Sequence, residues 1–286
     1  MKFDLNRAWT DALGLVSANS SVVAIVAGVF FFLPYLALML FAPQMFAGIE
    51  AQAQTQDPQA MMDAMMGVYA QYWWVFVLML LIQTIGMIAL IALLGDRARP
   101  TVGDAIVSAI KLLPSYIGAS LLTALAFMVV VAVVTAIGAA TGSHVILTLL
   151  GVAAFILLIY AYVKVMLFIP VLALEHTYNP VTALVRSWRL TRGNAFRLFL
   201  FYFLLLIAFV IVSAIIGMVF GLAFGLMGSE VAIVGNALVG AAVNSVFVVL
   251  FLAVLAATYR QLAAERVSVP ATAHDMDAPD DRDRRL

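Results

Sequence analysis

The chain has no cysteine and few charged residues, and both absences narrow its class. Without cysteine it has no disulfide, no thiolate nucleophile and no thiolate metal ligand. Only 10% of the 286 residues are charged, whereas 65% are hydrophobic. Soluble domains are usually about half apolar. The composition therefore predicts a membrane protein, and we expect no nucleic-acid partner.

Long apolar runs occupy most of the chain. Each is roughly 20 to 30 residues long, enough for a helix to cross a bilayer core of about 30 Å. The sequence thus predicts an all-α membrane protein with six transmembrane helices. The six runs are approximately 20–42, 71–94, 116–140, 145–173, 195–226 and 231–258.

Basic residues are missing from one set of connections between these runs. The loops near 43–70, 141–144 and 227–230 contain acidic residues but no lysine or arginine, whereas 14 of the 15 basic residues fall on the opposite side. Cytoplasmic loops carry an excess of Lys and Arg. Both termini are therefore predicted to be cytoplasmic. The remaining basic residue is Lys164, inside the fourth run.

Three short segments with one apolar face precede the first, third and fifth runs. Residues 102–109 align with 181–188 when the first segment is shifted by 79 positions, and their apolar positions coincide; the N-terminal segment matches more loosely. This pattern predicts three hairpins, each preceded by an interfacial amphipathic helix on the cytoplasmic surface. The alternative is that any six-span chain carries basic amphipathic linkers on one side.

The predicted division of the chain follows from these repeats. Residues 1–266 form a six-span membrane domain, with approximate repeats 1–97, 98–176 and 177–266. The tail, 267–286, lacks apolar periodicity and is predicted to be disordered. Because Asp4 and Asp11 precede the first apolar run, the start of the chain does not resemble a cleaved signal peptide.

A motif joins the fourth run to the fifth. The chain from Val163 to Asn194 resembles the bacterial family related to the membrane domain of glycerophosphoryl diester phosphodiesterases, in which a basic residue, a Pro and a Glu precede an A-x-x-R-S-W-x-L-T-x-G run. The matching residues are Lys164, Pro170, Glu175, Ala183, Arg186, Ser187, Trp188, Leu190, Thr191 and Gly193. The resemblance implies a bacterial inner-membrane protein. In members that are enzymes a soluble catalytic barrel follows the membrane domain, so we do not expect phosphodiesterase activity from this chain.

Lys164 is the one charged residue deep inside a predicted span, since Arg197 lies at the start of the fifth, and an intramembrane lysine costs on the order of 3 kcal/mol to insert. One interpretation is a structural cation, with Tyr160 one turn before it, Glu175 on nearly the same helical face, and Pro170 able to expose a backbone carbonyl. The other is contact with a ligand. Gln83, Asn236 and Asn244 complete the candidate intramembrane polar site with Lys164 and Glu175.

Basic residues surround a tryptophan after the fourth span. They are candidate contacts for lipid phosphates, with the tryptophan at the headgroup level. A dedicated phosphate pocket is the alternative, because Gly193 and Asn194 precede a helix N-terminus. The candidate contacts are Arg186, Trp188, Arg189, Arg192 and Arg197.

Small and amide residues recur every fourth position in the last two spans. Ser213, Gly217, Gly221 and Gly225 lie on one face of the fifth run, and Asn236, Gly240 and Asn244 lie on one face of the sixth. Small residues at this spacing allow helices to pack closely, and amides can hydrogen-bond across the contact. A polar pocket is the alternative, and Gln83 and Thr84 in the second span have the same two interpretations.

Nothing in the sequence resembles a metal or catalytic centre. His144, His176 and His274 are scattered, with no metal-ligand spacing. Methionines at 61, 62, 65 and 66 could bind Cu(I), but a lipid-facing helix beside an aromatic belt explains them equally. We therefore predict no metal, no cofactor and no enzymatic activity.

The sequence favours a non-enzymatic module that contacts membrane lipids, or an unidentified membrane-protein partner, in envelope and membrane homeostasis. The alternative is a small transporter or lipid-handling permease with a site near Lys164, since transporters are often built from repeats around a midplane site.

Overall fold

The computed structural model describes residues 3–41, 45, 57–95 and 100–267, without the side chains of 265–267. Within these residues the chain is helical and contains no strand. Six helical stretches are long and apolar enough to cross a membrane, which confirms the all-α, six-span prediction. The elements are α1 (Leu5–Ala18), α2 (Ser20–Ala27), η1 (Gly28–Phe32, continuing as helix to Phe41), α4 (Pro58–Gly95), α5 (Val102–Thr141), α6 (His144–Val165), α7 (Phe168–Glu175), α8 (Pro180–Leu190), α9 (Ala195–Gly225) and α10 (Ser229–Val267).

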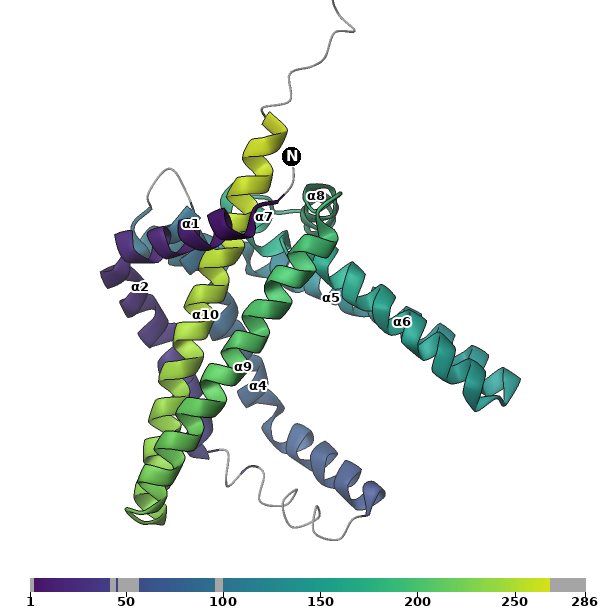
Figure 1. The fold of residues 1–286 in the computed structure, drawn as a ribbon, viewed down its shortest axis with the longest axis horizontal. Coiled ribbons are helices and arrows are strands. Elements are labelled where there is room, and N and C mark those ends of the chain that lie inside the picture. Colours follow the sequence, from purple (N-terminus) through teal and green to yellow (C-terminus); the bar gives the residue numbers. More distant parts are fainter. Residues whose placement is uncertain (1–2, 42–44, 46–56, 96–99, 268–286) are drawn as a thin grey trace, which may run out of the picture.

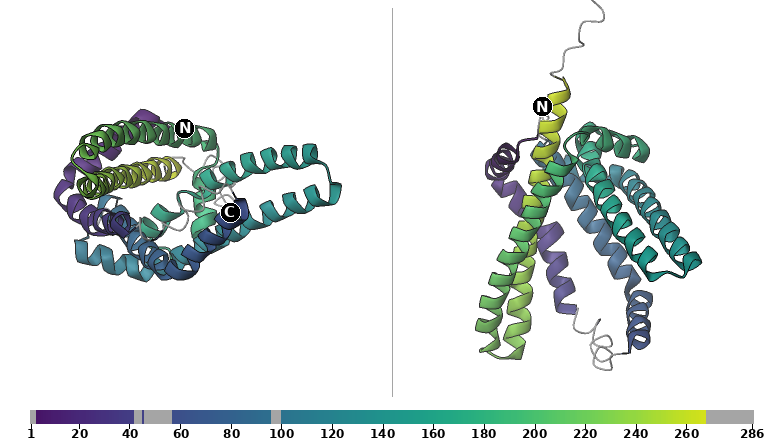
Figure 2. Two further views of the ribbon diagram at one scale, coloured as in Figure 1. Left: turned by 90° about the horizontal axis from the view of Figure 1, so that it is seen from below. Right: turned by 45° about the vertical axis from the view of Figure 1, so that its right-hand side comes forward.

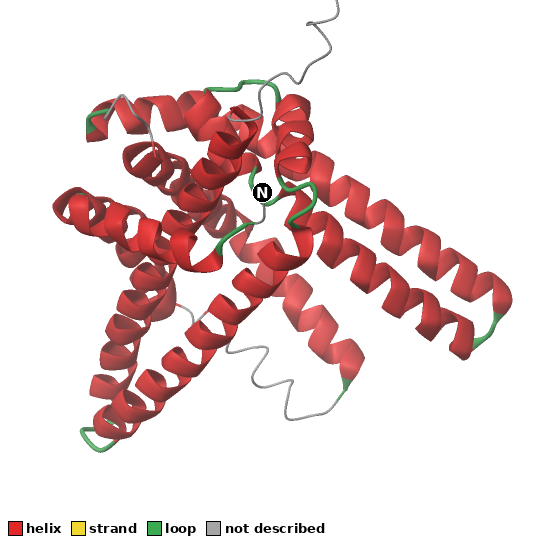
Figure 3. Ribbon diagram, turned by 45° about the horizontal axis from the view of Figure 1, so that its top comes forward, coloured by secondary structure: helices red, strands yellow, loops and turns green. Residues whose placement is uncertain are grey.

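The helices converge at one end of the molecule and spread apart at the other (Figures 1 and 2). The short helices α1, α7 and α8 lie at the convergent end, together with both ends of the described chain (Figure 3). The turns that join α5 to α6 and α9 to α10 lie at the spread end. The two ends of the molecule are therefore structurally distinct.

The packed core is concentrated at the convergent end. There the last turns of α4, residues 170–173 of α7 and residues 252–259 of α10 are mostly or fully buried, and Ala8 and Ala12 of α1 are fully covered. Lipid tails are as apolar as leucine, so membrane helices associate through close packing, which small side chains permit. In contrast, the most apolar stretch of 18 residues in α9 contains no buried residue. The outer surface of the spans is thus apolar and suited to lipid.

One close approach fixes the first span against α4. A Cβ atom on Gly86 would lie 2.4 Å from the Cβ of Phe30 in η1, so no larger residue fits there without a shift. The η1 segment is a π-helical widening that precedes Pro34. Proline cannot donate the backbone hydrogen bond of a regular helix, and such widenings commonly accommodate an interruption of this kind.

Two of the three predicted interfacial helices are separate from the span that follows them, and the third is not. α1 and α8 are distinct helices, and α8 begins at Pro180 because the Asn179 side chain accepts the N–H groups of Val181 and Thr182. Residues 102–113, in contrast, are the first turns of α5, which is continuous over 40 residues and contains Pro114. The Thr101–Asp104 capping box starts α5 well before its apolar part.

The predicted outer loop at 43–70 is partly helical. α4 begins at Pro58, so the Met-rich segment forms its first turns, and Met62 and Met66 are about as exposed as Trp73. The predicted tail beyond residue 267, and most of the loop before α4, lie outside the described residues. The repeat boundaries stay a prediction.

Candidate functional site

The fourth span is interrupted beside the motif's lysine. α6 ends at Val165 and α7 begins at Phe168, two residues before Pro170. At the interruption the backbone carbonyl of Lys164 accepts hydrogen bonds from Ser187 Oγ at 2.9 Å and Thr191 Oγ1 at 3.3 Å. Both hydroxyl residues are completely buried. They therefore attach α8 to the broken span through a carbonyl that lies six residues before Pro170.

The side chain of Lys164 is buried between two aromatic rings. Only 2% of the residue is exposed, and Nζ lies 5.5 Å from the ring centre of Tyr160 and 5.6 Å from that of Trp188. An ammonium over ring faces is stabilised by cation–π attraction. Lys164 also lies in the last turn of α6, where the backbone carbonyls favour a cation. These contacts support the structural interpretation of Lys164.

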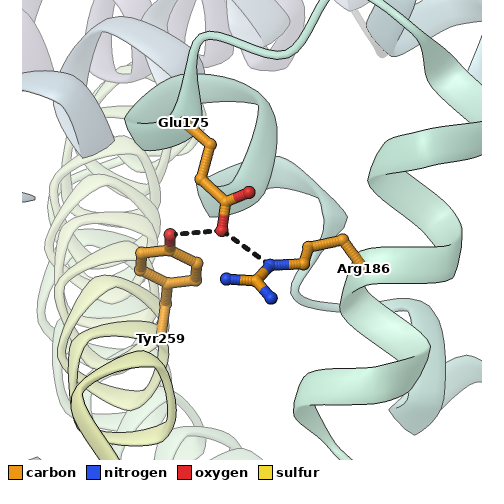
Figure 4. A network of polar contacts seen from close by, with 3 residues as sticks. All are labelled: Glu175, Arg186 and Tyr259. Carbon is orange, nitrogen blue, oxygen red and sulfur yellow. Dashed lines mark hydrogen bonds and ion pairs between the residues drawn. The ribbon is translucent and has the colours of Figure 1, made fainter. Parts of the chain in front are cut away.

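Glu175 links three helices (Figure 4). Its Oε1 accepts a hydrogen bond from Arg186 Nε at 3.0 Å and another from the hydroxyl of Tyr259 at 2.7 Å. These residues come from α7, α8 and α10 respectively. Lys164 makes no ion pair with Glu175, because the interruption at 166–167 breaks the helical register on which their shared face depended.

The start of α9 holds the beginning of the chain. Asn194 Oδ1 accepts the backbone N–H of Phe3 at 2.9 Å, and Arg197 donates to the Phe3 carbonyl at 3.3 Å. Gly193 has φ of 85°, a conformation that other residues rarely adopt. The groups proposed for a phosphate pocket therefore bind the protein's own backbone. We call the region formed by the motif, Phe3 and Tyr259 the junction.

The five predicted phosphate contacts divide into two groups. Arg186 and Arg197 are bonded inside the junction, whereas Trp188, Arg189 and Arg192 are exposed. The face of α8 that packs on the protein consists of small and polar side chains together with Leu190. Its predicted apolar stripe is largely exposed, at Val181, Val185 and Trp188, although the Trp188 ring also covers Lys164.

An apolar groove lies between α6 and the α9–α10 pair. Its volume is about 560 Å³. Only two of its lining residues carry a polar atom, and one of these, Tyr202, is bonded to Thr258 Oγ1 at 3.1 Å. The lining residues are Phe127 of α5, Phe155, Leu158, Ile159, Tyr162, Val163 and Met166 of α6 and its end, Phe199, Tyr202, Phe203, Leu205 and Leu206 of α9, and Phe247 and Phe251 of α10.

The remaining polar candidates lie apart from the junction. Asn236 and Asn244 line a separate cavity between α9, α10 and the first span. Gln83 lies on α4 and lines neither this cavity nor the groove, and its neighbour Thr84 is buried with no hydrogen-bond partner among the described residues. The structure thus separates the predicted polar site into Lys164 and Glu175 at the junction, the two asparagines in the cavity, and Gln83 alone.

Sequence reasoning missed Tyr259 and Phe3. Tyr259 is 84 residues from Glu175, and Phe3 is 191 residues from Asn194. No local pattern signals such pairs. The groove was also missed, because its aromatic and aliphatic lining is indistinguishable in sequence from lipid-facing residues.

Comparison with known proteins supports the motif. No curated protein and no solved structure matches the chain. Residues 137–278, which include α6 to α10 and almost all of the junction, match the family model described as the membrane domain of glycerophosphoryl diester phosphodiesterase. This part of the chain is therefore similar to that membrane domain, and the resemblance predicted from the motif is confirmed.

Proposed function

We propose that this protein binds membrane lipid, with an acyl chain in the groove between α6 and α9, and that it serves as a non-enzymatic module of the bacterial inner membrane. The groove carries the proposal. It is lined by apolar and aromatic side chains from four helices. Ligand sites are concave and mostly apolar.

The dimensions of the groove suit one acyl chain. Its α6 wall extends from Phe155 to Met166, about 16 Å at the rise of a helix. That is roughly half the thickness of a bilayer core, or one leaflet. The wall ends next to the junction, so a chain in the groove would place its headgroup near the convergent end.

The convergent end is suited to the headgroup level. Trp188 and the aliphatic stripe of α8 are exposed there, together with Arg189 and Arg192. An interfacial helix places apolar side chains in lipid and cations beside phosphates. Each such cation contributes about 1 kcal/mol near an anionic surface. We propose that α8 rests on the bilayer in this way.

Two observations favour binding over catalysis or transport. The Glu175 carboxylate is taken up by hydrogen bonds that Arg186 and Tyr259 donate to it. Lys164 is enclosed by Tyr160 and Trp188 and lines neither the groove nor the polar cavity. A permease with its site at Lys164 would need that ammonium to face a path for substrate, so this alternative has less support.

Filling the groove is expected to remove bound lipid. Leu206→Trp places a larger side chain in the groove, whereas Leu204→Trp changes an equally exposed residue of α9 that does not line it. Native mass spectrometry of the purified protein should show several-fold less retained lipid for Leu206→Trp and no change for Leu204→Trp. Equal retention by both variants would show that the lipid sits elsewhere.

We further propose that both termini are cytoplasmic, from the distribution of basic residues. Because the chain has no cysteine, single-cysteine labelling is free of background. An impermeant thiol reagent added to intact cells should label cysteines placed at Ser143 and Ser229, but not at Thr101 and Thr177. Labelling at Thr101 and Thr177 alone would show that the orientation is the reverse of the proposed one. Labelling at all four positions would contradict the six-span map.

A further inference from the structure

A second cavity lies inside the membrane-spanning part, away from the groove. Its volume is about 410 Å³, and it is lined by residues of α9, α10 and the first span. Asn236 and Asn244 lie about 10 and 22 Å along α10 from Ser229 at the rise of a helix, which is within the bilayer core. The lining residues are Tyr35, Phe209, Ser213, Ile216, Gly217, Gly221, Asn236, Val239, Gly240, Val243 and Asn244.

The polar groups of this cavity have no partner in the described part of the chain. Ser213 Oγ is buried without a hydrogen bond. Other hydroxyls on the membrane-spanning helices behave differently, since Ser245 of α10 donates to the Ala241 carbonyl at 2.7 Å and Thr123 of α5 to the Ala119 carbonyl at 2.8 Å. The side chains of Asn236, which is exposed, and Asn244, which is half-buried, also make no hydrogen bond to a described residue. An unsatisfied polar group in hydrocarbon costs several kcal/mol, so a hydrogen-bonding occupant would stabilise the cavity.

Glycines keep the cavity open rather than closing it. A Cβ atom on Gly221 would lie 3.9 Å from Asn236 Oδ1, one on Gly240 would lie 4.0 Å from a ring carbon of Tyr35, and one on Gly217 would meet nothing within 4 Å. Small residues usually serve close helix packing. At these positions the helices do not approach closely, and the missing side chains provide volume.

The lining defines the chemistry of the occupant. The cavity contains two amides and two hydroxyls but no charged residue, which disfavours an anion or a cation. Its remaining wall is apolar and includes Phe209, whose ring stacks on Phe247 at 3.7 Å. An occupant must therefore both exchange hydrogen bonds and contact hydrocarbon.

We propose that this cavity is a binding site for an uncharged, hydroxyl-bearing group, supplied either by the head of a neutral lipid or by a small polyol. Amide and hydroxyl groups pair with such a ligand as both donors and acceptors. The site is distinct from the lipid groove and would stand if the groove proved empty.

Equilibrium binding to the protein in lipid nanodiscs tests the proposal, with monoolein and free glycerol as separate probes. Saturable binding of monoolein alone identifies a lipid source, and saturable binding of glycerol alone identifies a free polyol. The Asn236→Leu variant should weaken the binding that occurs about tenfold, which corresponds to about 1.4 kcal/mol and lies within the range for loss of one hydrogen bond. Absence of saturable binding for both probes would overturn the proposal.

Two further variants keep the test decisive. Gly221→Val fills the cavity without removing a polar group and should weaken binding as well, which covers the case in which Asn236→Leu fails to fold. Ser245→Ala removes a hydroxyl from α10 that is bonded to its own helix and does not line the cavity. Binding by Ser245→Ala should equal that of the unmodified protein. Unchanged binding by folded Asn236→Leu and Gly221→Val would place the ligand elsewhere.

Discussion

Replacing Glu175 with alanine is expected to lower the free energy of unfolding by about 2 kcal/mol, since hydrogen bonds to a charged group are worth roughly 1.5–3 kcal/mol. The carboxylate is the shared acceptor for Arg186 and Tyr259. Tyr259 is 8% exposed, so its hydroxyl has little access to solvent once the carboxylate is gone. Thermal denaturation in detergent, followed by the loss of folded protein, measures the change.

Arg186→Ala should have a smaller effect than Glu175→Ala. The Arg186 side chain is 41% exposed, so solvent screens the pair and the liberated carboxylate keeps its bond from Tyr259. Glu230→Ala is the matched control, because Glu230 is an exposed carboxylate at the opposite end of α10. It should change stability by only a few tenths of a kcal/mol.

A double-mutant cycle isolates the contact between α7 and α10. If Glu175 and Tyr259 interact as the structure shows, the Glu175→Ala and Tyr259→Phe effects should sum to more than the effect of the double variant, by on the order of 1 kcal/mol. Strict additivity would mean that the hydroxyl and the carboxylate do not stabilise each other. The cycle thereby separates this hydrogen bond from other consequences of each change.

The spans were predictable from sequence because length and hydropathy suffice for helices that satisfy their own backbone. The interruption of the fourth span was less predictable from the sequence. Pro170 indicated a local disturbance, but not that α6 would stop at Val165 or that Ser187 and Thr191 would bind the carbonyl of Lys164. Those partners are 23 and 27 residues away, and their approach depends on tertiary packing.

Extrapolation along a single ideal helix explains the main error at the site. Residues eleven apart share a face only if the helix between them is continuous, and the break between α6 and α7 separates Lys164 from Glu175. The continuity of α5 shows the opposite case. Its N-terminal segment resembles an independent amphipathic helix, yet the helix passes through Pro114 without a break.

Lys164→Glu should produce the largest loss of folded protein. The change would place a carboxylate against the electron-rich faces of Tyr160 and Trp188 and beside the partially negative carbonyl end of α6. A buried charge without a partner of opposite charge destabilises the folded protein by several kcal/mol. We expect little or no protein of this variant in the membrane fraction, measured by immunoblot at matched transcription.

Lys164→Met supplies the comparison that assigns the role of the lysine. Losing the cation–π contacts costs up to about 2 kcal/mol, whereas removing an intramembrane charge relieves on the order of 3 kcal/mol. The methionine variant should therefore accumulate normally and melt at the same temperature or higher, and Lys164→Arg should be tolerated. If Lys164 is structural, Lys164→Met should also restore the phenotype of a deletion strain. A folded, abundant Lys164→Met protein that fails to complement would contradict the structural role and identify the ammonium as a ligand contact.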